Sequence, residues 1–143
     1  MTDNPQTTDS ILTIQRTFRA PIDRVWRAFT EASELEAWFV PEGMTATVVA
    51  NELKPNGVMA IHWTDGENTI ENEGYFVEVL EHERIVTGEE IPEGELTLTY
   101  EFREVEDGTE VTIVQEFPDG VPDGANAGWS GMLDNLSERL DRE

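Results

Sequence analysis

Hydrophobic positions follow two periods along the chain, and each stretch of constant period predicts one kind of element. Residues 11–19 alternate between apolar and polar side chains, which is typical of a strand. One face of this strand would carry Leu12, Ile14, Arg16 and Phe18. Pro21 suits the first turn of a helix. The apolar spacing over residues 22–29 then predicts an amphipathic helix.

A second short helix is expected over residues 33–39. Ser33 is a suitable N-cap and Glu36 follows three residues later, as in a capping box. Pro41 and Gly43 then end the helical pattern.

From residue 45 the period changes to two, and turn signals separate the alternating runs. The predicted strands cover residues 45–53, 58–64, 68–80, 84–89, 96–102 and 109–117. Asn56-Gly57 is the signal of a tight hairpin between the first two of them. Meandering strands joined by tight turns predict an antiparallel sheet.

The last segment returns to helical spacing, with one apolar stripe formed by Trp129, Met132, Leu133, Leu136 and Leu140. We therefore expect an α+β fold, in which a curved antiparallel sheet of about six or seven strands wraps around a long C-terminal helix. Two short helices follow the first strand. This single domain covers residues 11–143, after a disordered tail of residues 1–10.

Charge excludes several classes of partner. Nine Lys and Arg against 31 Asp and Glu give a net charge of −22. Such a chain will not bind nucleic acids or anionic membranes, since both need positive charge. The excess fits an ordinary acidic protein or adaptation to molar salt. The single lysine, Lys54, favours salt adaptation, because this composition resembles that of cytosolic proteins of extreme halophiles.

Chemistry-bearing residues are sparse. The chain has no cysteine and two histidines. His62 is expected on the outer face of its strand and His82 in an acidic turn, and their spacing matches no metal motif. We predict no catalytic residue, no metal site and no cofactor. The chain shows neither a membrane span nor a signal peptide, which predicts a cytoplasmic protein.

Several short strings occur in an order that resembles one family. They are Arg16, Phe18, Ala20-Pro21, Val25 to Phe29, Leu35, Trp38-Phe39, Pro41, Leu53 to Gly57, Gly74, Glu78-Val79, Arg84 to Val86, Gly108-Thr109, Gly128-Trp129, Leu133 and Leu136. This set resembles the SRPBCC superfamily, the START and birch-pollen-allergen-like proteins. Within it, the match is to proteins similar to the C-terminal domain of the activator of heat-shock protein 90 ATPase. The family often has Trp-Trp where this chain has Trp38-Phe39.

The resemblance implies a helix-grip fold with a cavity between the sheet and the C-terminal helix, which holds a small apolar ligand in related proteins. The wall candidates are Trp38, Phe39, Met59, Ile61, Trp63, Phe76, Leu98, Tyr100, Trp129, Met132 and Leu133. The same residue types at these spacings are also typical of a filled core. The polar candidates are Arg16 and Glu78. Arg16 either reaches solvent at the end of its strand or is buried, and a buried Arg16 would pair with Glu52 or Glu78. One alternative is a cyclase- or dehydrase-like enzyme, which would require a polar group such as Tyr100, Glu78 or Arg16 in the cavity with a shifted pKa. The other is a co-chaperone-like domain with a chaperone as its partner.

Overall fold

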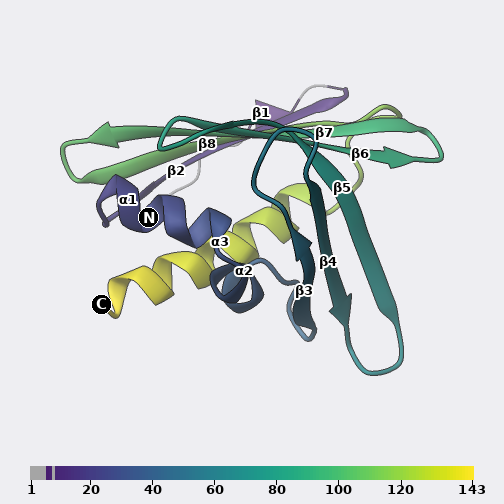
Figure 1. Ribbon diagram of the computed structural model, residues 1–143, viewed down its shortest axis with the longest axis horizontal. Helices are drawn as coiled ribbons and strands as arrows, with labels where there is room; N and C mark the ends of the chain where they lie inside the picture. Colours follow the sequence, from purple (N-terminus) through teal and green to yellow (C-terminus); the bar gives the residue numbers. More distant parts are fainter. Residues whose placement is uncertain (1–5, 8) are drawn as a thin grey trace.

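The computed structural model describes residues 6–7 and 9–143. The predicted element order is confirmed, with three helices and a single sheet (Figure 1). The elements are β1 (Gln6–Thr7), β2 (Ile11–Phe18), α1 (Ile22–Thr30), α2 (Ala32–Trp38), β3 (Thr45–Asn51), β4 (Val58–Thr64), β5 (Thr69–Leu80), β6 (Arg84–Ile91), β7 (Gly94–Val105), β8 (Gly108–Glu116) and α3 (Ala125–Asp141). Of the tail expected over residues 1–10, residues 1–5 and 8 lie outside the described residues, whereas Gln6 and Thr7 pair with β2.

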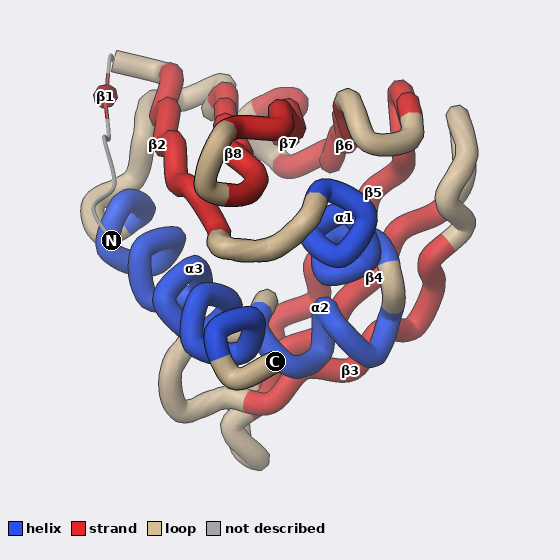
Figure 2. Tube along the Cα trace, turned by 90° about the vertical axis from the view of Figure 1, so that its left-hand side faces the viewer, coloured by secondary structure: helices blue, strands red, loops and turns tan. Residues whose placement is uncertain are grey.

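The sheet is antiparallel at every pairing and has the order β1-β2-β8-β7-β6-β5-β4-β3. Only the two-residue strand β1 exceeds the six or seven strands expected. Figure 1 shows β3, β4 and β5 descending from the layer formed by β2, β8, β7 and β6, and Figure 2 shows the sheet curving around the helices. The sheet therefore has a concave face, and the helices lie on it.

Two bulges accompany this curvature. The register of β3 against β4 shifts between Val48 and Ala50, and that of β5 against β6 shifts between Phe76 and Glu78. A bulge adds one residue to one strand, which bends the strand and reverses the alternation of its side chains. The second bulge determines which face of the sheet carries the side chain of Glu78, one of the predicted site residues.

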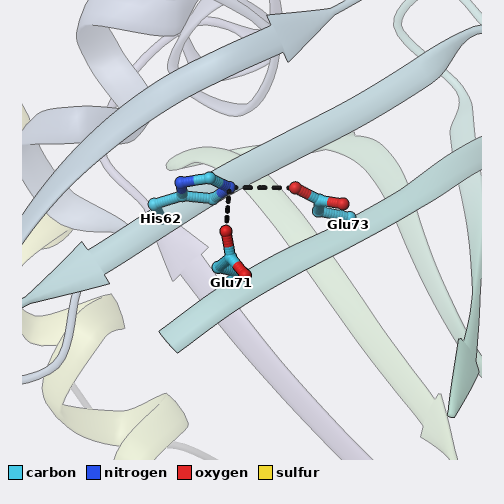
Figure 3. A group of neighbouring side chains, drawn as sticks. All are labelled: His62, Glu71 and Glu73. Atoms are coloured by element: carbon cyan, nitrogen blue, oxygen red, sulfur yellow. Dashed lines mark hydrogen bonds and ion pairs between the residues drawn. The ribbon is translucent and has the colours of Figure 1, made fainter. Parts of the chain in front are cut away.

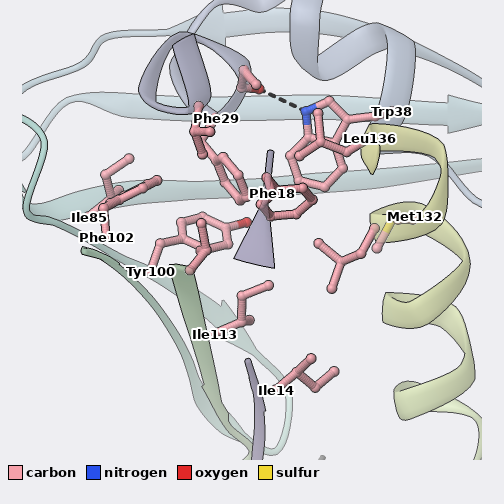
Figure 4. Close-up of a cluster of buried hydrophobic side chains, with 14 of the residues drawn as sticks. Ile14, Phe18, Phe29, Trp38, Ile85, Tyr100, Phe102, Ile113, Met132 and Leu136 are labelled. Carbon is pink, nitrogen blue, oxygen red and sulfur yellow. Dashed lines mark hydrogen bonds between the residues drawn. The ribbon is translucent and has the colours of Figure 1, made fainter. Parts of the chain in front are cut away.

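The core lies between the concave face and the helices (Figure 4). Every residue of the predicted stripe of α3 is buried, which confirms that helix face. Phe29 of α1 packs its ring 5.0 Å from that of Tyr100 and 4.9 Å from that of Trp38, measured between centroids. Trp38 also donates a hydrogen bond from Nε1 to the carbonyl of Ala28, over 2.7 Å. No helix in the described part of the chain is long and apolar enough to cross a membrane.

The turn between β3 and β4 requires its Asn-Gly pair. Asn56 adopts φ of 66°, the left-handed region that asparagine tolerates better than most residues. A Cβ on Gly57 would lie 1.9 Å from the carbonyl oxygen of Glu52, so only glycine fits there.

The capping box expected at Ser33 is wrong. The N-cap of α2 is Glu31, which makes no side-chain capping bond. Glu36 instead accepts a hydrogen bond from the backbone N–H of Val48, over 2.8 Å. The carboxylate therefore joins α2 to β3, a use that the local sequence does not reveal.

An ionic network joins the three helices. Arg24 of α1 donates hydrogen bonds to Glu34 of α2 and to Glu143 after α3, and Arg139 of α3 donates to Glu34 over 3.1 Å. Burial alone would raise the pKa of Glu34, but the hydrogen bond from Arg139 and the charge of Arg24 outweigh it and lower the pKa. The hydrogen bond from Arg24 likewise lowers the pKa of Glu143.

Candidate ligand-binding cavity

A cavity of about 300 Å³ lies between the concave face of the sheet and α3. Its lining comes from five strands, the start of α3 and the segments next to them: Phe39, Pro41, Met59, Ile61, Trp63, Asn72, Thr87, Glu89, Leu96, Leu98, Gln115, Phe117, Ala125, Gly128, Trp129 and Met132. A smaller hollow of about 50 Å³ adjoins it and shares five of these residues. Apolar side chains dominate both linings, as in most small-molecule sites.

Strand alternation creates most of this wall. Met59, Ile61 and Trp63 occupy alternate positions of β4 and point to the same side. Leu96 and Leu98 do the same on β7. The period-two pattern therefore predicts the wall directly, once the concave face is known.

The indole N–H groups of the two tryptophans in the wall both donate hydrogen bonds. Trp63 donates from Nε1 to the carbonyl of Phe39, and Trp129 donates from Nε1 to Oε1 of Gln115, both over 2.8 Å. The ring of Phe39 lies 5.5 Å from that of Trp63 and 5.7 Å from that of Trp129, centroid to centroid. These contacts fix the orientations of the rings at the cavity wall.

Four polar side chains interrupt the apolar lining. Asn72 donates to the carbonyl of Ile61 over 3.3 Å, and Gln115 accepts from Trp129. Thr87 is buried. Glu89 is half-buried, and its burial raises the pKa of its carboxyl group. Among the described residues, the carboxyl group of Glu89 has no hydrogen-bonding or ionic partner.

Nine of the eleven predicted wall residues border these two hollows. Seven of them line the larger one, and Phe76 and Tyr100 line the smaller one. Trp38 and Leu133 line neither, since both are fully buried in the core, with 0% exposure. For these two, the helical pattern predicted burial and could not tell core packing from a cavity wall.

The two polar candidates lie elsewhere. Arg16 is buried and does not turn to solvent at the end of its strand, but it meets the second half of α3, where Nη1 lies 2.8 Å from a carboxylate oxygen of Asp134. The expected partners Glu52 and Glu78 are therefore wrong. Glu78 pairs with Arg84 over 3.0 Å, outside both hollows. It shares the parity of Phe76, but the bulge between them turns its side chain to the other face.

Tyr100 is the titratable group of the smaller hollow, and the enzyme alternative would require such a group with a shifted pKa. Its burial raises its pKa, so the phenol keeps its proton at neutral pH. A phenol in this state can donate a hydrogen bond but does not act as a base.

A group outside the cavity brings together one histidine and two carboxylates (Figure 3). His62 Nε2 lies 3.0 Å from a carboxylate oxygen of Glu73 and 3.7 Å from one of Glu71. One ligand atom from each residue lies within 4.8 Å of the others, which is close enough to bind one metal ion. The side chains of Glu71 and Glu73 are 64% and 60% exposed, respectively, so the group is equally suited to ion pairing in water. The sequence did not predict it, because strand pairing alone brings β5 to His62.

Comparison with known proteins identifies a family and solved structures with the same fold. The family model described as "Activator of Hsp90 ATPase homolog 1-like protein" matches residues 19–141. A solved structure from Chromobacterium violaceum is 24% identical, with a TM-score of 0.83 over 92% of this chain and 98% of its own. An AHSA1-like protein from Aeromonas hydrophila is 21% identical, with a TM-score of 0.79 over 92% of each chain. No curated protein is significantly similar to the chain.

Proposed function

The chain belongs to the family of Activator of Hsp90 ATPase homolog 1-like proteins, and we propose that it binds a small apolar molecule in the cavity between its sheet and α3. The observation that carries this proposal is an apolar space of about 300 Å³ that the side chains leave unfilled. Protein interiors are normally close-packed, whereas these apolar walls remain accessible to water. A ligand that covers them would remove apolar surface from water, which is favourable.

The size and composition of the cavity support the same proposal. Small-molecule sites span about 300–1,000 Å³ and combine apolar walls with few polar groups. At about 300 Å³ the cavity suits a compact ligand, such as one or two fused rings with a short side chain. Three aromatic residues from separate elements, Phe39, Trp63 and Trp129, offer it flat surfaces.

The direct test is binding of a neutral fluorescent probe, N-phenyl-1-naphthylamine, to the full chain in molar KCl. Two glycines of α3 provide a matched pair of variants. A Cβ added to Gly128 or to Gly131 would have no neighbour within 4 Å, but only Gly128 lines the cavity. We expect Gly128→Leu to weaken probe binding and Gly131→Leu to leave it unchanged. Absence of binding to the wild type, or an equal effect of both variants, would contradict the proposal.

Extraction of the protein purified from its native host, followed by mass spectrometry, identifies the natural ligand. A stoichiometric apolar molecule that is lost in the folded Gly128→Leu variant would give its chemical class. An extract without such a molecule would favour the second candidate function, which is docking to a protein partner.

Docking to a protein partner is the second candidate, in keeping with the activators after which the family is named. It is favoured by large apolar side chains that are exposed on β3, β4 and β5. They include Val49, Val58, Ile70 and Val77, which are 59%, 47%, 47% and 50% exposed. Val49→Ser and Val77→Ser would abolish docking to a partner without affecting probe binding, which separates the two candidates.

A further inference from the structure

One ionisable residue, Glu89, lies among the sixteen that line the cavity. It follows Ile85 and Thr87 at alternate positions of β6, and these two are buried on the concave side. Alternation therefore directs Glu89 to the same side, at the end of the strand where the cavity lies. Its neighbour Glu90 is exposed and lines neither hollow.

The surroundings of Glu89 do not compensate its charge. No lysine, arginine or histidine lines the cavity, and the carboxyl group has no hydrogen-bonding or ionic partner among the described residues. A partly buried carboxylate without a partner is unfavourable, which is consistent with its raised pKa. A ligand that supplies a donor or a positive charge would remove this cost.

The aromatic walls favour the same kind of ligand. Trp63, Trp129, Phe39 and Phe117 line the cavity together with Glu89. The face of an aromatic ring attracts a cation, most strongly for tryptophan. The net charge of −22 also attracts cations and repels anions over the whole molecule. An anionic ligand would find no counter-charge in the lining.

We propose that the cavity selects an amphiphilic amine, whose ammonium group pairs with the carboxylate of Glu89 and whose apolar body lies between the aromatic walls. This inference rests on the proposed binding function and specifies its ligand class. It distinguishes the site from one for fatty acids or other apolar anions, whose carboxylates Glu89 would repel.

Three probes with one naphthyl body test this selectivity: 2-(1-naphthyl)ethylamine, 2-(1-naphthyl)ethanol and 1-naphthylacetate. Their affinities are measured by calorimetry at pH 7 in molar KCl, which screens the general field of the molecule. We expect the amine to bind roughly 10-fold to 100-fold more tightly than the alcohol, the range of a hydrogen bond to a charged group. The acetate should bind most weakly.

Two variants locate the effect. Glu89→Gln keeps the shape of the side chain and should reduce amine affinity to that of the alcohol, while alcohol affinity stays the same. Glu90→Gln removes the same charge at an exposed neighbour and should change neither affinity. Equal binding of amine and alcohol, tightest binding of the acetate, or an unchanged amine affinity in Glu89→Gln would overturn the inference and leave the binding function standing. Failure of all three probes to bind would overturn both.

Discussion

The indole nitrogen of Trp129 donates a hydrogen bond to the side-chain oxygen of Gln115 over 2.8 Å, which joins α3 to β8 at the cavity wall. Trp129 is 5% exposed, and its ring also lies 6.2 Å from that of Tyr100, centroid to centroid. The residue thus belongs both to the core and to the lining. Its position couples the docking of α3 to the shape of the cavity.

Two replacements of Trp129 should separate the contribution of its buried ring from that of its hydrogen bond to Gln115. Trp129→Ala removes a buried aromatic side chain and should lower the free energy of unfolding by about 3–5 kcal/mol. Trp129→Phe keeps an aromatic ring but leaves Oε1 of Gln115 without its donor, and should cost about 1–2 kcal/mol. Urea denaturation in molar KCl measures both. A near-neutral Trp129→Ala would mean that α3 is not held to the sheet at this point.

Salt should determine the stability of the whole domain. Self-repulsion at a net charge of −22 opposes the compact state, and the Debye length falls to about 3 Å in 1 M salt. We expect partial unfolding at millimolar KCl and a thermal midpoint that rises steadily towards molar KCl. Sucrose provides the control, because it stabilises by exclusion from the surface and screens no charge. An unchanged midpoint between low and molar KCl would contradict adaptation to salt.

The family resemblance implied the cavity, and local patterns predicted which side chains share a face of a strand or helix. Met59, Ile61 and Trp63 share a side because they alternate on β4, and Trp129 and Met132 share one because they lie three residues apart on α3. No knowledge of distant contacts is needed for these positions. That explains why most of the predicted wall is present.

The positions that the sequence did not reveal depend on pairing between distant segments. The bulge after Phe76 turns the side chain of Glu78 to the other face of the sheet, and no residue type in this segment indicates a bulge. Glu89 looks like any other surface carboxylate in this acidic chain until the cavity is seen beside it. The strand pattern left open whether Arg16 is buried or reaches solvent, because its partner Asp134 lies 118 residues away.

Acid should weaken the network between the helices. Because the folded-state pKa of Glu34 is lowered from its ordinary value of 4.5, its ionised form stabilises the fold above that pH, and this contribution is lost as the pH falls through the folded value. Glu34→Gln should therefore cost about 1–3 kcal/mol at pH 7. The difference from the wild type should shrink as the pH falls through the folded-state pKa of Glu34, because the wild-type carboxyl group then loses its charge.

Urea denaturation at pH 7, 5 and 3 measures this difference. Glu42→Gln is the control, since Glu42 is exposed and takes no part in the network. A Glu34 effect that stays constant until the wild type unfolds in acid would show that its charge does not contribute.

The glycines of α3 should reveal whether the cavity limits the stability of the helix. Gly128 and Gly131 both lie within α3 with open space around them, and neither has a positive φ. Alanine at either position should stabilise the fold by about 0.5–1 kcal/mol, because glycine is a poor helix former. Only Gly128→Ala places its methyl group at the cavity, so only this variant should weaken probe binding.

Equal gains in stability with a loss of binding at Gly128 alone would show that this glycine keeps the cavity open at a cost to the stability of the helix. Unchanged binding in both variants would place the entrance of the ligand elsewhere in the lining.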